Sequence, residues 1–227
     1  MEFQVNDKNA TLCLNMIVKN ESKIITRLFD SVLSIIDCYC ICDTGSTDNT
    51  IEIIENYFKN KNKPGKVVKE PFKNFCHNRN FALQACKYMS DYVLLLDADM
   101  ILDIQNFDKV FLKTADSFHI IQGNETFYYE NIRIVKNDGL YKYVGVTHEY
   151  IDVPSGTTIS PINKNNIFIK DIGDGGSKHN KFERDITLLI DGINEEPTNP
   201  RYHFYLGNTY YDLKRFGEAI NLYKKRI

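Results

Sequence analysis

The sequence predicts an α/β protein with a mixed, mostly parallel sheet between helices, followed by a short all-α extension. Strand-like and helix-like segments alternate over residues 11–96, as they do when crossover helices join parallel strands. One run, YVLLL at 92–96, is apolar without alternation, which is typical of a strand covered on both faces. In such sheets, ligands bind beyond the carboxyl ends of the strands.

Composition narrows the class of protein. The chain has 227 residues, 43% apolar and 26% charged, so it can bury a sizeable core. A net charge of −2 with interspersed signs provides no basic surface for nucleic acid. Because we find neither an apolar run of membrane-spanning length nor a secretory signal at the start, we predict a cytoplasmic protein without a membrane span.

The six cysteines fit that compartment, because they lie on predicted buried elements without the density of a disulfide scaffold. Cys38, Cys40 and Cys42 alternate along one predicted strand and therefore face the same way. A metal site is one interpretation, but no matching Cys or His pair lies nearby in the sequence. We expect small buried apolar side chains instead.

The first half of the chain is predicted to consist of strand and helix units. Apolar residues such as Ile24, Leu28 and Val32 recur at three- and four-residue spacing, which indicates a helix. Thr47 or Asp48 can cap the helix that follows the second strand. The predicted elements are strands at 11–18, 39–42, 66–69 and 92–96, with helices between them at 24–36, 51–58 and 75–89.

After residue 100 the parallel pattern fades. We expect a short helix near 107–112 and strands at 117–122 and 126–135. Asn137-Asp138-Gly139 is a turn signal, and a further strand-like segment follows at 141–152.

Polar side chains follow the predicted parallel strands. Asn20 and Glu21 follow the first strand, Asp43 follows the second, and Asp97 and Asp99 follow the fourth. Since the carboxyl ends of parallel strands meet at one edge, we expect these groups to converge on one crevice. There is no Gly-x-Gly-x-x-Gly after the first strand and no phosphate-binding P-loop, which argues against a dehydrogenase and a P-loop enzyme.

Asp97 and Asp99 are separated only by Ala98. On an extended backbone their side chains would leave the same face, roughly 7 Å apart at about 3.3 Å per residue. Two carboxylates suit Mg²⁺ or Mn²⁺, which take further oxygens from substrate phosphates. Asp-x-Asp is also common in turns, and that interpretation stays open. With a metal neutralising a diphosphate, Asp43 would accept a hydrogen bond from a base or ribose.

Four ordered motifs resemble family 2-like glycosyltransferases of the GT-A fold, a Rossmann-like fold whose members transfer a sugar from a nucleotide diphosphate. They are MIVKNE at 16–21, DTGSTD at 43–48, NRNFA at 78–82 and LDADM at 96–100. The resemblance implies a nucleotide-binding set of Asn20, Glu21, Asp43, Arg79, Asn80, Asp97 and Ala98.

Within that set, the resemblance implies that Glu21 and Asp43 line the base pocket and that Arg79 and Asn80 support it. Asp97 is assigned to the ribose and metal shell, and Asp99 to direct metal ligation. A helix-surface ion pair is the alternative role for Arg79.

The second half is expected to build the acceptor side. His148 and Glu149 resemble the "HE" element that follows the Asp-x-Asp motif in this family. Glu149 is the candidate base, and His148 is a candidate ligand of the metal or contact of the diphosphate. Alternatively, Glu149 pairs with a buried arginine such as Arg133, and His148 only packs.

The loop DIGDGGSKHN at 171–180 has three glycines that permit close backbone approach. Lys178 and His179 could reach a diphosphate there, and the resemblance implies a segment that closes over the donor.

The tail changes character, so we predict a catalytic domain at 1–178 and a helical extension at 179–227. Leu206, Gly207, Tyr210, Ala219 and Tyr223 fall at the spacing of a tetratricopeptide repeat. Such a repeat would bind a protein partner, and a chain ending inside one suggests a fragment. An ordinary helical hairpin is the alternative.

Together these features predict a metal-dependent glycosyltransferase of the hexosyltransferase type. The resemblance implies a UDP-sugar donor rather than a GDP-sugar, because uridine donors are the commoner case in that family, with Mn²⁺ or Mg²⁺ as cofactor. The acceptor would be a hydroxyl group of a protein, a glycan or a lipid-linked sugar, attacked with inversion. A catalytically silent nucleotide-binding scaffold is one alternative. A nucleotidyltransferase is another, although MIVKNE lacks the glycine-rich loop expected after its first strand.

Overall fold

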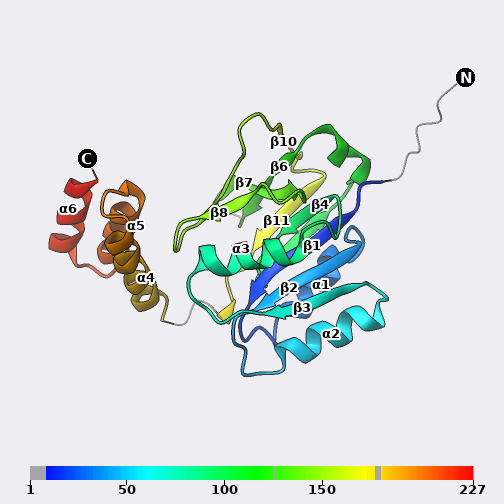
Figure 1. The fold of residues 1–227 in the computed structure, drawn as a ribbon, viewed down its shortest axis with the longest axis horizontal. Coiled ribbons are helices and arrows are strands. Elements are labelled where there is room, and N and C mark those ends of the chain that lie inside the picture. Colours follow the sequence, from blue (N-terminus) through cyan, green and yellow to red (C-terminus); the bar gives the residue numbers. More distant parts are fainter. Residues whose placement is uncertain (1–8, 125, 177–179, 227) are drawn as a thin grey trace, which may run out of the picture.

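The structure is a computed structural model that describes residues 9–124, 126–176 and 180–226. In this part of the chain, nine strands form one sheet in the order β3-β2-β1-β4-β7-β6-β11-β5, with β10 joined to β6. Figure 1 shows the sheet in the centre, with three C-terminal helices grouped at one end of the molecule. The predicted α/β class with a helical extension is confirmed.

The first half follows the expected alternation of strands and helices. Strands β1 and β2 pair in parallel, as do β2 and β3, and β4 pairs in parallel with the other edge of β1. The elements are β1 (Leu12–Val18), α1 (Ile25–Val32), β2 (Cys38–Asp43), α2 (Thr50–Asn60), β3 (Gly65–Lys69), α3 (Phe75–Cys86) and β4 (Tyr92–Leu95).

The second half adds the antiparallel strands. β7 pairs antiparallel with both β4 and β6, while β8 and β9 form a separate two-stranded sheet. The short helix expected near 107–112 is a 3-10 helix at Lys109–Thr114. The strands are β5 (Met100–Ile104), β6 (Ser117–Gly123), β7 (Tyr128–Lys136), β8 (Lys142–Val144), β9 (Tyr150–Asp152), β10 (Ile159–Pro161) and β11 (Ile167–Asp171).

The sheet is covered on both faces, which explains the unbroken apolar strands. On one face, aromatic rings of α1 and α2 meet the strands, and Phe58 stacks on Tyr39 with ring centroids 4.0 Å apart. On the other face, α3 packs over buried cysteines of β1 and β2. The six cysteines are free, and five of them are buried, as expected for small apolar side chains.

The helical extension consists of α4 (Lys181–Glu195), α5 (Pro200–Asp212) and α6 (Phe216–Lys225). Gly207 allows α5 and α6 to approach closely, since a Cβ atom there would lie 2.5 Å from the Tyr223 ring. The extension also shares a small core with the loop between β8 and β9, centred on Val146, Leu189 and Tyr202. Within the described residues, no helix has the length and apolarity to cross a bilayer.

Candidate active site

A cavity of about 880 Å³ lies beyond the carboxyl ends of the parallel strands. Its wall contains Asn20 and Glu21 after β1, together with Asp97, Ala98 and Asp99 after β4. Arg79 of α3 also lines the cavity, so the structure brings together six of the residues proposed from sequence motifs. Residues 171 and 174–176, from β11 and the segment that follows it, complete this side of the wall.

The loops after β1 and β2 fasten each other. Asn20 has a left-handed backbone with φ 57°, which its short polar side chain tolerates. Its side-chain Oδ1 accepts a hydrogen bond from the Thr47 backbone amide at 2.7 Å. Its backbone amide donates to Ser46 Oγ at 2.9 Å. Asp43 is 3% exposed, and Oδ1 accepts from the Gly45 and Ser46 amides, both at 3.0 Å. Asp43 is thus placed to shape this loop and is not among the residues of the cavity wall.

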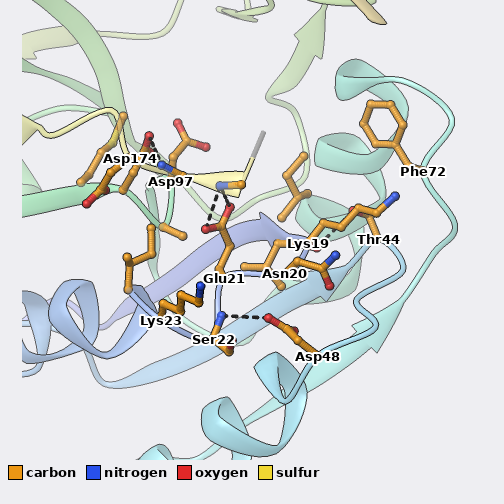
Figure 2. Close-up of a pocket in the computed structure, with 18 of the residues that line it drawn as sticks. Lys19, Asn20, Glu21, Ser22, Lys23, Thr44, Asp48, Phe72, Asp97 and Asp174 are labelled. Carbon is orange, nitrogen blue, oxygen red and sulfur yellow. Dashed lines mark hydrogen bonds between the residues drawn. The ribbon is translucent and has the colours of Figure 1, made fainter. Parts of the chain in front are cut away.

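Glu21 lies in the middle of the residues that Figure 2 draws, beside Asn20 and Ser22. The Gly176 amide donates to both of its carboxylate oxygens, at 3.0 and 3.1 Å. Burial raises the pKa of Glu21 to about 7; the Gly176 amide opposes this rise, and the nearby charge of Asp99 adds to it. Glu21 can therefore exist in both protonation states near neutral pH.

The segment from Asp97 to Met100 is a turn, so the expectation of an extended backbone was wrong. The Met100 amide donates to the Asp97 carbonyl at 3.1 Å, which reverses the chain between β4 and β5. The two aspartates consequently have different partners. Asp97 accepts from Arg79, whereas Asp99 Oδ2 accepts from the Gly175 amide at 3.3 Å. Residues 97–100 therefore form the turn that Asp-x-Asp sequences favour, and do not continue the strand.

Arg79 bridges two carboxylates that are distant in the sequence. Its Nη2 lies 2.6 Å from Asp97 Oδ1, and its Nε lies 2.5 Å from Glu149 Oε1. Burial lowers the pKa of Arg79, but the charges of Asp97 and Glu149 raise it well above its ordinary value. The side chain is only 11% exposed, so a helix-surface ion pair does not describe it. The buried partner of Glu149 is Arg79, and not Arg133 as the alternative supposed.

Three other motif residues lie outside the described cavity wall. His148 has φ 51°, and its ring stacks on Tyr205 with centroids 4.2 Å apart, so the structure does not bring it to the aspartates. Burial lowers its pKa. Asn80 instead joins α3 to β8, accepting from the Tyr143 amide at 2.7 Å and donating to the Tyr143 carbonyl at 2.9 Å. Glu149, the third motif residue outside the cavity wall, contacts Arg79 as described above.

The remaining candidates Lys178 and His179 lie outside the described residues. Just before them, the segment 174–176 has three attachments, two of them to the wall residues Asp99 and Glu21. Besides the contacts of Gly175 and Gly176, Asp174 accepts two hydrogen bonds from Arg27, at 2.9 and 2.7 Å.

Sequence reasoning missed Arg184, which lines the cavity from α4. No motif marks it, and the sequence predicts its helix as part of the separate extension at 179–227. It also missed Phe72 and Phe75 as wall residues.

Comparison with known proteins places the chain in a family. The Glycosyl transferase family 2 model matches residues 13–170. The SPbeta prophage-derived glycosyltransferase SunS of Bacillus subtilis (strain 168) is 27% identical over 241 residues, covering 96% of this chain. The chain spans 53% of the length of SunS. An uncharacterized glycosyltransferase of Rickettsia conorii, RC0292, is 34% identical over 95 residues, or 42% of this chain and 31% of that protein.

Solved structures share the fold at low sequence identity. S. aureus TarS 1–349 in complex with UDP-GlcNAc has a TM-score of 0.54 and 16% identity, covering 93% of this chain and 79% of that chain. The mannosyltransferase PcManGT from Pyrobaculum calidifontis, in complex with GDP-Man and Mn²⁺, has a TM-score of 0.55 and 14% identity, covering 95% and 74%. The chain belongs to glycosyl transferase family 2 and has a GT-A-like fold.

Proposed function

We propose that this protein transfers a sugar from a UDP-sugar to a hydroxyl acceptor with the help of Mn²⁺ or Mg²⁺. The observation that carries the proposal is the meeting of Glu21, Asp97 and Asp99 in the wall of one cavity at the strand ends. TarS and PcManGT, which share the fold, are complexes with a UDP-sugar and with a GDP-sugar plus Mn²⁺, and these support a nucleotide-sugar donor.

The nucleoside end of the donor would lie at the loops after β1 and β2. Asn20 and Glu21 line the cavity there, and Asp43 holds the second loop from behind. A carboxyl group with a pKa of about 7 can either donate to a carbonyl of the base or accept from its N–H group. Asp97 and Ala98 would face the ribose, and Lys178 would approach the diphosphate.

The chemistry of Asp97 and Asp99 fits a hard divalent cation. Among the described residues, no three His, Cys, Asp or Glu side chains are grouped to hold a metal. The two aspartates would therefore depend on donor phosphate oxygens and water to complete the shell, as Mg²⁺ commonly does. A bound cation would neutralise charge on the leaving diphosphate. His148 could join the site only if its ring left Tyr205.

We propose inversion at the anomeric carbon, with Glu149 accepting the proton of the attacking hydroxyl. The carboxylate lies 2.5 Å from Arg79 Nε, and Arg79 in turn lies 2.6 Å from Asp97. This chain of contacts links Glu149 to Asp97, which supports a role for Glu149 beside the proposed metal site. An acceptor hydroxyl would have to approach Glu149 beside the guanidinium.

The reaction class is tested by its products. The protein would be incubated with a panel of UDP-sugars and GDP-sugars plus Mn²⁺, and the nucleotide released would be identified. Release of UDP, in transfer or slow hydrolysis, supports the proposal. A parallel incubation with UTP or GTP and a sugar 1-phosphate that releases pyrophosphate would indicate a nucleotidyltransferase, and binding without turnover for any donor would indicate a silent scaffold.

For the helical extension we keep the division at 178/179 and the tetratricopeptide-like repeat as proposals. The close packing of Gly207 on Tyr223 and the burial of Ala219, which is 1% exposed, support the repeat. The Tyr223 hydroxyl also donates to Asn208 Oδ1 at 2.9 Å. In this proposal, α5 and α6 begin an array that recruits a protein partner.

A further inference from the structure

One residue of the cavity wall comes from the helical extension. Arg184 lies on the first turns of α4, whereas the other described residues of that wall lie between 17 and 176. A helix outside the matched family segment, which ends at residue 170, therefore contributes to the proposed donor site.

The Arg184 side chain is held by contacts on two sides. Its guanidinium lies over the Phe75 ring, 4.9 Å from the centroid. Asp185 Oδ1 accepts from Nε at 3.1 Å and from Nη2 at 3.0 Å, and it also accepts from Thr147 Oγ1 at 3.4 Å. Because Asp185 is only 2% exposed, this anchor is rigid, and Arg184 keeps 25% of its own side chain accessible.

These contacts place Arg184 near the aspartate turn. Phe75 and Arg79 are four residues apart on α3, so they share a face with Cβ atoms about 6 Å apart. Arg184 stacks on the first of them, and the second contacts Asp97 at 2.6 Å. Arg184, Asp97 and Asp99 thus all contribute to the wall of one cavity, where a nucleoside diphosphate could contact both the guanidinium and the proposed metal site.

The excess of acidic residues in the cavity wall favours a further cation beside the diphosphate. Acidic residues outnumber basic ones in the described wall, and Arg79 is already bridged to two carboxylates. A diphosphate would add further negative charge to this wall. The acidic residues are Glu21, Asp48, Asp97, Asp99, Asp171 and Asp174, and the basic residues are Lys19, Lys23, Arg79 and Arg184.

We propose that Arg184 binds the diphosphate of the nucleotide-sugar donor, so that the helical extension completes the donor site. This rests on the proposed function. The planar guanidinium suits phosphate oxygens, and its stacking on Phe75 reduces the conformational entropy lost on binding. Asp185 acts as a positioning residue that holds the guanidinium from behind.

The test compares ligands that differ only in phosphate. Affinities for uridine, UMP and UDP would be measured by calorimetry or competition, with Mn²⁺ constant, for the wild type and Arg184→Gln. We expect UDP affinity to fall roughly 10- to 100-fold, the usual effect of losing hydrogen bonds to a charged group, while uridine affinity stays unchanged. Arg184→Lys should recover part of the loss.

Lys181→Gln is the matched control, since it removes a positive charge from an exposed position of the same helix outside the cavity wall. It should leave UDP affinity unchanged. An equal loss of affinity for uridine and UDP in Arg184→Gln, or no loss for UDP, would overturn the role of Arg184. Either result would leave the proposed function intact. Failure of the wild type to bind UDP or GDP would contradict the proposed function and this inference with it.

Discussion

The carboxylate of Asp97 lies between two arginine side chains. Arg79 is 2.6 Å away, and Arg133 Nη1 is 3.7 Å from the other oxygen. Arg133 is itself held by Gln122 Oε1, which accepts from its Nε at 2.6 Å. Buried charges of this kind persist only when each has a partner, so these residues act as a unit with Glu149.

The role of Glu149 is tested by Glu149→Gln. Glutamine keeps an oxygen that can accept from Arg79 but loses the ability to take a proton at neutral pH. We expect UDP affinity to stay within about twofold and transfer to fall roughly 100- to 10,000-fold. A loss of UDP binding would show instead that Glu149 serves to hold Arg79 and Asp97.

Glu21 predicts a pH dependence of stability. Its folded pKa of about 7 exceeds the ordinary value of 4.5, so its protonated form is favoured in the folded state. This contribution is fully present below about pH 4.5 and is lost as pH rises through 7, amounting to at most about 3 kcal/mol.

The matching variant is Glu21→Gln, which resembles the protonated form at every pH. Thermal unfolding measured from pH 5 to pH 8.5 should show the wild type losing stability relative to the variant as pH rises. Parallel profiles for the two proteins would mean that the Glu21 pKa is not raised in the folded state.

At the level of elements, the parallel strands could be predicted because apolar runs and helical spacing are local signals. The positions of the strand ends therefore predicted that Asn20, Glu21, Asp97 and Asp99 lie in the wall of one cavity, as the structure shows. The backbone between Asp97 and Asp99 could not be predicted, because the same three residues suit a strand end and a turn. Only the reversal into β5, which pairs with β11, selects the turn.

Asn80 is a motif residue whose side chain connects two elements, α3 and β8, in the structure. Its side chain satisfies both the amide and the carbonyl of Tyr143 on β8. Asn80→Ala leaves those groups without this partner, so we expect the free energy of unfolding to fall by about 1–3 kcal/mol. Urea titration measures this. Unchanged stability with a loss of UDP affinity would support direct participation in nucleotide binding, as the family resemblance implied.

On the scale of the whole molecule, the sequence predicts a catalytic domain and a separate helical extension, whereas in the structure the two are in contact. Periodicity identifies each helix of the extension but carries no information on what it touches. The stack of His148 on Tyr205 and the hydrogen bond from Arg201 to the His148 carbonyl, at 2.6 Å, cross the expected boundary. These contacts explain why His148 faces the extension and why Arg184 could not be foreseen as a wall residue.

The measurement that tests the central claim most directly is calorimetric titration with UDP and GDP, in Mn²⁺ and then in EDTA. We predict binding of UDP that requires Mn²⁺ and is abolished in Asp99→Asn, whose thermal unfolding should remain cooperative. Unchanged Mn²⁺-dependent affinity in that variant would remove Asp99 from the metal site. No binding of either nucleotide by the wild type would contradict the account of the cavity as a nucleotide-sugar site.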